Sequence, residues 1–458
     1  MNIVQRLILT LCISLLSTAC VTSGEVPARI LQINSLDSLS DNTGEFKGLE
    51  FLANPLPGQV KNRVNIMYMH GIGWTEDRSK EQLANSFIIG LAEAYGLEVK
   101  ENYISSLCGE TDYDQREANQ DFIYIRNQTP QYFETIIPDQ QLRLDQLVCM
   151  DRTILQIGDN LEFALYRIFW DEIFWNELQF AHVGQDDYQG SSKEFAGQRR
   201  KYNRILKDDL VNYGFSDAVM YLGPAGTQIR RAVKGAMCSA ALDAAGFSFE
   251  QQGASVSQEN VCSTADNTSL ELNQFAFVTE SLGSKIMFDL MQDAQRDGED
   301  TAIDELIAGS EVYMLANQIA LLSLSDLSVT PKTALPPSAS TADRPRLVAM
   351  SEINDFLTYE LIPFVEQIHK RSFSNGYSSG GLNSVEKRKE VIEKIGFDMV
   401  DVRLEFADQL LPVVKSFVDP KDAHSGHASE ETIMKLILCG AKNGRLITEG
   451  CLAGIEDE

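Results

Sequence analysis

The chain has 458 residues, with 39 Lys and Arg against 66 Asp and Glu, which gives a formal net charge of −27. Hydrophobic residues make up 44% and charged residues 23% of the chain, a composition that excludes a disordered, collagen-like or polytopic membrane protein. The acidic balance also excludes a nucleic-acid-binding protein, because phosphate backbones are bound by stripes of Lys and Arg, and the longest basic cluster here is confined to residues 199–204.

The N-terminus has the pattern of an export signal. Residues 7–16 form an apolar run that is too short to cross a bilayer, which takes about 20 residues, and small residues follow it up to Cys20. We predict that residues 1–19 are a signal peptide. The ending Leu16-Ser17-Thr18-Ala19-Cys20 resembles a bacterial lipobox, which implies that Cys20 is diacylated and becomes the first residue of the mature protein.

The residues after Cys20 predict where the protein is held. Val21, rather than Asp, follows the cysteine, and this resembles the sorting pattern of outer-membrane lipoproteins. We therefore expect a protein of the bacterial cell envelope, attached to the outer membrane by its N-terminal lipid; the alternative is a plain secretory signal that is cut nearby. Residues 20–45 are polar and without periodicity, which predicts a tether to a folded domain over residues 46–458.

Apolar runs alternate with helical periodicities along this domain, which predicts an α/β fold with a mostly parallel central sheet flanked by helices. A last strand over residues 399–407 alternates apolar with charged residues, and we expect it at an edge of the sheet with one face in water. Large cap-like insertions are expected at about residues 105–155 and 185–262. Buried strands are expected at residues 64–69, 161–170, 272–278, 312–316 and 347–350.

One serine joins a strand directly to a helix. Residues 275–285 predict the end of the strand expected at 272–278, which runs into an amphipathic helix across a single serine, Ser281. A sharp turn of this kind exposes the hydroxyl and directs the helix N-terminus towards the reacting centre. The residues two positions before and after the serine must be small, because backbones crowd at such a turn. Gly283 meets this requirement, whereas Thr279 stands where a glycine is usual, so the pattern is T-x-S-x-G.

Together with a His-Gly turn at residues 70–71, this pattern resembles the α/β-hydrolase superfamily, in particular its serine esterase and lipase-like members. The resemblance covers residues 60–440 as an order of elements and implies that Ser281 is the nucleophile. It also implies an oxyanion hole, formed by the backbone N–H groups of Leu282 and Ile72.

The same resemblance implies the positions of the acid and the base. The acid follows the second strand beyond the nucleophile, where Asp355 matches best and Glu352 is the alternative. The histidine follows the last strand, where both His424 and His427 occur; we prefer His424, because its A-H-x-G sequence resembles the family's histidine loop. The chain order of serine, aspartate and histidine is that of the family.

The residue types predict a reaction class. A serine hydroxyl becomes a nucleophile when an imidazole takes its proton, and an acid holds the imidazole in the correct tautomer. We therefore expect a serine hydrolase that cleaves carboxylic esters through an acyl-enzyme, on a small neutral or acyl-ester substrate and without a cofactor. Amide or thioester hydrolysis remains open, as does a catalytically silent hydrolase-fold lipoprotein with a binding or structural role. A metal site at His424 and His427 lacks a third ligand at motif spacing, so no metal is predicted.

The cysteines predict disulfides. Of the eight cysteines, Cys12 lies in the signal and Cys20 carries the lipid, which leaves six in an oxidising compartment. Six thiols allow many connectivities, of which we prefer the one that pairs neighbours in the sequence. The expected pairs are Cys108–Cys149, Cys238–Cys262 and Cys439–Cys451.

Overall fold

The computed structural model describes residues 28–52, 54–55, 62–71, 87, 89–92, 122–123, 132–134, 141–143, 148–157, 161–170, 215–245, 275–297, 306–325, 344–372, 384–407, 418, 420–448 and 451. Over these residues the largest sheet has ten strands. They are β1 (Arg29–Ser35), β3 (Asn54–Pro55), β4 (Asn62–Met69), β5 (Phe122–Ile123), β8 (Cys149–Ile157), β9 (Leu161–Phe169), β10 (Phe275–Glu280), β11 (Glu311–Leu315), β12 (Arg346–Glu352) and β13 (Asp398–Glu405).

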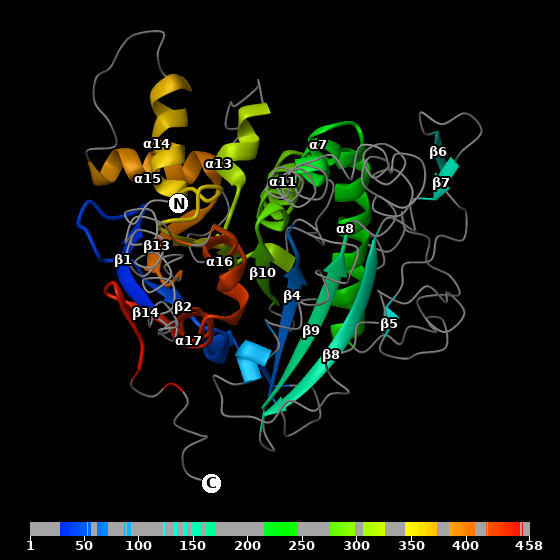
Figure 1. Ribbon diagram of the computed structural model, residues 1–458, viewed down its shortest axis with the longest axis horizontal. Coiled ribbons are helices and arrows are strands. Elements are labelled where there is room, and N and C mark those ends of the chain that lie inside the picture. The colour runs from blue at the N-terminus through cyan, green and yellow to red at the C-terminus, as the bar shows by residue number, and fades with distance from the viewer. Residues whose placement is uncertain are drawn as a thin grey trace, which may run out of the picture.

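The sheet is mixed and mostly parallel. Its order is β1-β13-β12-β11-β10-β4-β9-β8-β5, with β3 paired to β4 outside this path. All neighbours from β13 to β9 pair in parallel, whereas β1 and β8 pair antiparallel with the outer members of that group. Figure 1 shows β1 on one side of the sheet and β8 with β5 on the other. The predicted α/β fold is confirmed.

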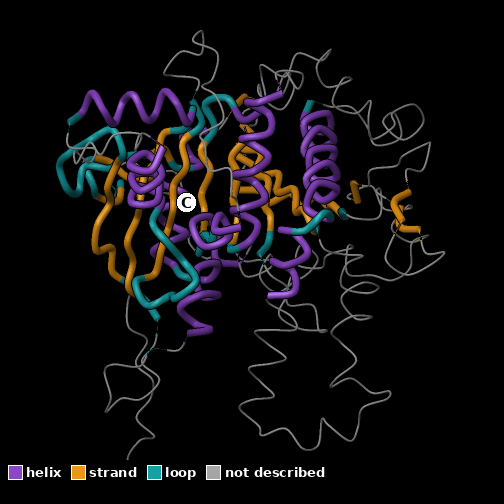
Figure 2. The backbone as a smooth tube through the Cα atoms, turned by 90° about the horizontal axis from the view of Figure 1, so that it is seen from above, coloured by secondary structure: helices purple, strands orange, loops and turns teal. Residues whose placement is uncertain are grey.

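Helices lie against this sheet (Figures 1 and 2). No helix within the described ranges is both long and apolar enough to span a bilayer. The helices are α7 (Ser216–Leu222), α8 (Ala225–Ala244), α11 (Leu282–Asp297), α13 (Ile319–Leu322), α14 (Leu361–Ser372), α15 (Val385–Ile395), α16 (Pro420–Ser425) and α17 (Glu431–Cys439), with 3-10 turns η1 (Leu49–Leu52), η8 (Ser323–Ser325) and η10 (Gly426–Ser429). Small sheets are formed by β2 (Phe46–Lys47), β14 (Gly440–Lys442) and β15 (Arg445–Leu446), and by β6 (Tyr132–Glu134) and β7 (Gln141–Arg143).

Two hydrophobic clusters cover the two faces of the sheet. Successive residues of a strand point to opposite faces, so Met67 and Met69 of β4 pack on the side of α8, α11 and α14, whereas Ile66 and Tyr68 pack on the side of α17. Because both faces are buried, the central strands are nearly continuous apolar runs, as is usual for parallel sheets. This packing fixes the carboxyl ends of β10, β12 and β13 at one edge of the sheet.

The prediction that the last strand lies at an edge was wrong. β13 pairs with β12 on one side and with β1 on the other, and β1 lies in the segment expected to be a tether. The charged residues of β13 have partners: Asp401 is buried, whereas Arg403 and Glu405 are half-buried. Asp401 accepts the N–H groups of Leu361 and Ile362 at 2.9 Å each, and Arg403 forms an ion pair with Glu360.

The second expected insertion, at residues 185–262, contains part of the core. Helix α8 lies inside it, and its residues Ile229, Val233 and Ala236 are completely buried against the sheet. The alanines and the two glycines of this helix leave little side-chain bulk on its buried face, so a stretch that was assigned to an insertion provides a packing face. Likewise β8 begins at Cys149, within the first expected insertion. Strands β5, β6 and β7 also fall within the first stretch, and helix α7 falls within the second; most of the other residues of both stretches lie outside the described ranges.

Candidate active site

Ser281 lies in a strained turn between β10 and α11. Its φ angle is +50°, in the left-handed region that residues with a β-carbon rarely adopt. The Ser281 N–H donates to the carbonyl of Leu315 on the neighbouring strand at 2.8 Å, and the Ser281 carbonyl accepts the N–H of Ser284 at 3.1 Å. These two hydrogen bonds hold the turn that aims the hydroxyl away from the sheet.

Small residues surround this turn because backbones meet there. A β-carbon at Gly283 would lie 2.6 Å from the carbonyl oxygen of His70 and 2.7 Å from that of Met69. One at Gly71 would lie 2.5 Å from the β-carbon of Ser281. Thr279, which replaces the usual glycine, fits because its hydroxyl oxygen lies 3.0 Å from that of Ser284, inside the first turn of α11.

The structure brings Ser281, His424 and Asp355 together in one hydrogen-bonded line. The Oγ of Ser281 lies 2.9 Å from Nε2 of His424, and Nδ1 of His424 lies 2.7 Å from Oδ2 of Asp355. All three residues are at least 95% buried. Asp355 follows β12 and His424 lies in α16, beyond β13, so each side chain reaches Ser281 from the carboxyl edge of the sheet.

Asp355 fixes the direction of these hydrogen bonds. Burial alone would raise the pKa of Asp355, but the hydrogen bond and charge of His424 and the hydrogen bonds from Thr358 and from the N–H of Leu357 together hold that pKa below its usual value. An ionised carboxylate can only accept, so Nδ1 of His424 donates to it. Nε2 then carries a lone pair and accepts the hydrogen bond that the Ser281 hydroxyl donates.

The two alternative residues have other contacts. Nδ1 of His427 donates to the backbone carbonyl of His424 at 3.1 Å, and burial lowers the pKa of His427 to about 4, so the ring stays neutral and supports the turn that carries His424. Glu352 accepts from the backbone and side-chain amides of Asn354, the latter at 2.8 Å. Within the described residues, His424 and Asp355 are therefore the histidine and the acid that form a line with Ser281.

Of the two residues expected to form an oxyanion hole, the structure describes Leu282. Leu282 is the first residue of α11, where a backbone N–H has no acceptor within its own helix, and it follows Ser281 directly. Ile72 lies outside the described residues. The preceding His70 shapes this loop: its Nδ1 donates to the carbonyl of Gly71 at 2.8 Å, and its own carbonyl accepts the indole N–H of Trp170 at 3.0 Å.

Sequence reasoning missed two buried residues of this region. Glu280, the last residue of β10, accepts a hydrogen bond of 2.6 Å from the hydroxyl of Tyr68 on β4. Burial raises the pKa of Glu280 to about 7, although the hydrogen bond from Tyr68 and the charge of His424 lower it. A carboxyl group at the end of a strand that has no other charged residue was the signal that could have identified Glu280.

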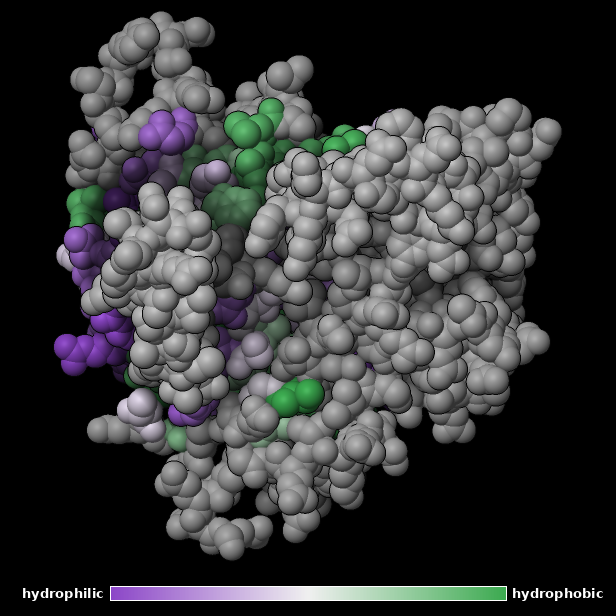
Figure 3. Space-filling model, viewed as in Figure 1, coloured by the Kyte–Doolittle hydropathy of each residue, from purple (hydrophilic) through white to green (hydrophobic). Residues whose placement is uncertain are grey.

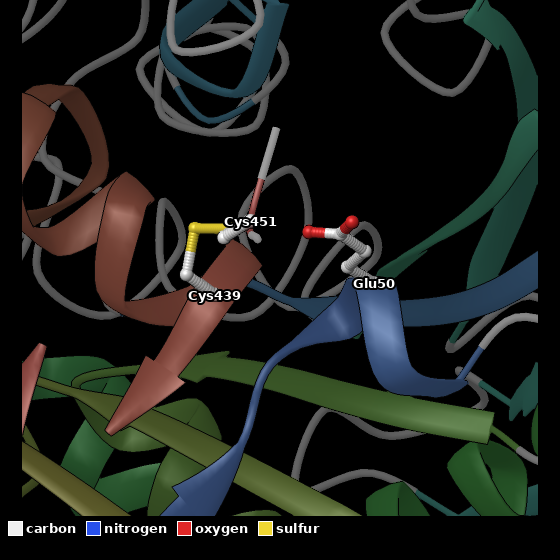
Figure 4. A group of neighbouring side chains, drawn as sticks. All are labelled: Glu50, Cys439 and Cys451. Atoms are coloured by element: carbon white, nitrogen blue, oxygen red, sulfur yellow. A yellow bond between two sulfur atoms is a disulfide. The ribbon is translucent and has the colours of Figure 1, made fainter. Parts of the chain in front are cut away.

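One predicted disulfide is confirmed. Cys439 and Cys451 are bonded, and Cys238 is also disulfide-bonded. Cys20, Cys108, Cys262 and the side chain of Cys149 lie outside the described residues. Figure 4 shows Glu50 beside the Cys439–Cys451 bond. These three residues have the spacing of metal ligands, but the two sulfurs bond each other and so provide no thiolate.

Comparison with protein-family models, with curated proteins and with solved structures finds no match.

Proposed function

We propose that the protein is a serine hydrolase of the α/β-hydrolase superfamily that cleaves carboxylic esters through an acyl-enzyme. The observation that carries the proposal is the line of hydrogen bonds from Ser281 through His424 to Asp355, at 2.9 and 2.7 Å. A nucleophile hydrogen-bonded to a base that a third group orients is the constellation that activates a serine. The strained backbone at Ser281 also supports a functional role, because such strain is concentrated at active sites.

The order of elements supports the family. Ser281 follows β10, Asp355 follows the second parallel strand beyond it, and His424 follows the last long strand. This is the order that the sequence resemblance implied, and the sharp strand–serine–helix turn occurs at the expected place.

In the proposed reaction, Nε2 of His424 takes the hydroxyl proton of Ser281 as Oγ attacks the ester carbonyl. The N–H of Leu282, with that of Ile72 as the expected second donor, stabilises the negative charge on the carbonyl oxygen. Asp355 stabilises the imidazolium, which then protonates the leaving alcohol. A water molecule, deprotonated by His424, releases the acid product and regenerates Ser281.

Charge and surface favour a neutral, partly apolar substrate. The net charge of −27 repels anions at long range. Three large side chains of the loop around Asp355 are exposed although Asp355 itself is buried: Ile353 at 51%, Phe356 at 55% and Tyr359 at 44%. Figure 3 shows further apolar surface in the region of α13 and α7. Apolar surface beside the triad fits an acyl chain better than a polar group.

The attachment of the protein is part of this proposal. The lipobox-like ending at Cys20 supports a lipid anchor in the outer membrane of a bacterial cell. In that location the substrate would be an ester of the envelope or one that enters it.

A fluorophosphonate probe tests the proposal, since it labels an activated serine and ignores an inert one. We expect labelling of the wild type, none of Ser281→Ala, and a loss of ester turnover by several orders of magnitude in Ser281→Ala and in His424→Ala. The double variant should lose no more than either single variant, because both residues serve one step.

Ser351→Ala is the matched control, because Ser351 is also a buried serine at the carboxyl end of a parallel strand, and its hydroxyl has no hydrogen-bond partner within the described residues. It should be labelled like the wild type. A wild type that is neither labelled nor active on esters of any acyl length would instead support a catalytically silent binding protein.

A further inference from the structure

A buried carboxyl group lies directly beside the proposed nucleophile. Glu280 precedes Ser281 and is 2% exposed, and Oε2 accepts the hydrogen bond from the Tyr68 hydroxyl at 2.6 Å. Val278 and Ala276, two and four positions earlier on the same face of β10, pack in the apolar cluster that includes residues of α16 and α17. An apolar residue at position 280 would continue this pattern without the cost of burying a carboxyl group.

The hydrogen-bond partner of Glu280 is a phenol, not a cation, so this is not a buried ion pair. Burial raises the pKa of Glu280 to about 7, and the charge of His424 acts in the opposite direction. Glu280 therefore changes its charge near neutral pH. It directly precedes Ser281, whose Oγ lies 2.9 Å from Nε2 of His424, so its carboxyl group and the imidazole lie on either side of one residue. Groups with these properties are concentrated at functional sites.

Other ionisable groups surround Glu280. Tyr68 is itself fully buried, and burial and the charge of Glu280 raise the pKa of Tyr68, so the phenol remains a neutral donor. Buried titratable or charged groups towards the same end of the surrounding elements include Tyr68 on β4, His70 after β4, Arg167 on β9, Tyr313 on β11, His424 on α16 and His427 on η10. Asp422 also lies on α16, whereas Arg63, Glu162 and Glu311 lie at the amino ends of β4, β9 and β11.

We propose that Glu280, held in place by Tyr68, is a second acidic group that acts on His424: its ionised carboxylate stabilises the imidazolium that forms when Ser281 gives up its proton. This inference rests on the serine-hydrolase function proposed above. In the step concerned, the proton moves from Oγ of Ser281 to Nε2 of His424, and Glu280 neither gains nor loses one. Glu280 is thus a positioning residue that supplies charge, and Asp355 remains the hydrogen-bond partner of the imidazole.

The proposal predicts a pH-dependent effect of Glu280→Gln, which keeps the shape of the side chain and an acceptor for Tyr68. The measurements are the rate of fluorophosphonate labelling and kcat/KM for a p-nitrophenyl ester, on the full-length protein in detergent. At about pH 5.5 the wild-type carboxyl is protonated, so the two proteins should react equally. At about pH 8.5 the variant should be slower by about tenfold, because one negative charge near the imidazolium is missing.

Tyr68→Phe provides a graded second test. The hydrogen bond from the Tyr68 hydroxyl lowers the pKa of Glu280, so removing that hydroxyl should move the ionisation of Glu280 to higher pH. We expect this variant to be slower than the wild type at about pH 7.5 and to recover as the pH rises further, whereas Glu280→Gln does not recover. A role in packing alone would produce neither pattern.

Glu311→Gln is the control. Glu311 is also a buried glutamate whose pKa burial raises to about 7, but it lies at the opposite, amino end of β11, beside Arg346. It should follow the wild-type pH profile. The inference would be overturned if Glu280→Gln reacted as fast as the wild type at both pH values, or if it lost the same factor at both. Probe labelling of the wild type would still support the serine hydrolase in that case. An unlabelled wild type would overturn both.

Discussion

Ser281, His424 and Asp355 could be identified from sequence because each follows a strand in a fixed chain order. Each of the three residues lies in the segment that directly follows a strand, so the turn at the end of that strand positions it. The structure joins them by hydrogen bonds of 2.9 Å, between Ser281 and His424, and 2.7 Å, between His424 and Asp355. Glu280 and Tyr68 could not be paired in this way. Their hydrogen bond depends on the parallel register of β10 and β4, which no local pattern encodes.

At Asp355 we expect an amide to be far less effective than the carboxylate. In Asp355→Asn the side-chain N–H would face Nδ1 of His424 and favour the tautomer with a proton on Nε2, which cannot accept the proton of Ser281. We expect kcat for ester hydrolysis to fall by about 10⁴-fold, as in serine-triad enzymes generally.

Asp401→Asn is the comparison for this substitution. Asp401 is also a buried aspartate, but it accepts the first N–H groups of α14. Its substitution should lower the free energy of unfolding by about 1 kcal/mol and leave kcat of the folded protein close to that of the wild type. Equal losses of kcat in the two variants would contradict the role given to Asp355.

Among the elements, β13 shows what a charge pattern can and cannot predict. Alternation of apolar and charged residues correctly predicted a strand, but the charged face was assigned to water. Asp401, Arg403 and Glu405 instead pair with α14, with Glu360 and with β1. An alternating pattern therefore predicts the strand, whereas its neighbours depend on segments far away in the chain, here the N-terminal β1.

The junction of β10 and α11 should not tolerate a β-carbon at Gly283. In Gly283→Ala the new methyl would lie within 2.7 Å of two backbone carbonyl oxygens, of Met69 and His70. Backbone cannot move as a side-chain end can, so we expect a loss of about 1–3 kcal/mol in the free energy of unfolding, measured by urea denaturation, and a displaced Ser281 with little probe labelling.

Gly223→Ala is the matched control for this variant. Gly223 ends α7 at a φ of −85°, and its added β-carbon would be 3.4 Å from the nearest atoms. We expect stability within about 0.5 kcal/mol of the wild type and unchanged labelling. Comparable losses in both glycine variants would show that the crowding at Gly283 is not the cause.

The C-terminal disulfide connects the end of α17 to the segment that follows β15. The bond closes a loop with a sequence separation of 12. Replacing both Cys439 and Cys451 by Ser should lower the free energy of unfolding by about 3 kcal/mol under oxidising conditions. The chemical denaturation midpoint measures this change. A difference below about 0.5 kcal/mol would mean that the loop is held by packing alone.

At the scale of the whole molecule, the alternation of strands and helices was enough to predict the fold class. It did not predict which segments belong to the core. Helix α8 and strand β1 lie in segments assigned to an insertion and a tether, because their apolar faces become apparent only against the assembled sheet. The roles of such segments are determined by tertiary packing, which overrides local propensity.

Buried carboxyl groups should make the stability of the molecule depend on pH. Burial raises the pKa of Glu311 to about 7, above the value of 4.5 for an exposed glutamate, so the folded state holds this proton more tightly than the unfolded state does. The stabilisation is complete below about pH 4.5 and is lost as the pH rises through 7, by as much as about 3 kcal/mol. Glu311→Gln should therefore gain stability relative to the wild type between these pH values.

Urea denaturation at several pH values measures this gain. Glu393→Gln, which removes an exposed charge from α15, controls for the general effect of one charge. A difference between Glu311→Gln and wild type that stays constant across the pH range would contradict the linkage. The neutral His427 acts in the opposite sense, since its pKa of about 4 makes the folded state less stable as the pH falls below about 6.5.

The antiparallel direction of β1 determines which end of the molecule is nearest to a lipid on Cys20. Arg29, the first residue of β1, pairs with Glu405 at the carboxyl end of β13, the same edge at which Ser281 and Asp355 lie. Arg29 is nine positions after Cys20 in the sequence, and an extended chain covers at most about 3.4 Å per residue. An acylated Cys20 would therefore keep Arg29, at this edge of the sheet, within about 30 Å of the bilayer. A hydrolase anchored in this way would act on esters in the membrane or close to it, and on none at the far side of the periplasm.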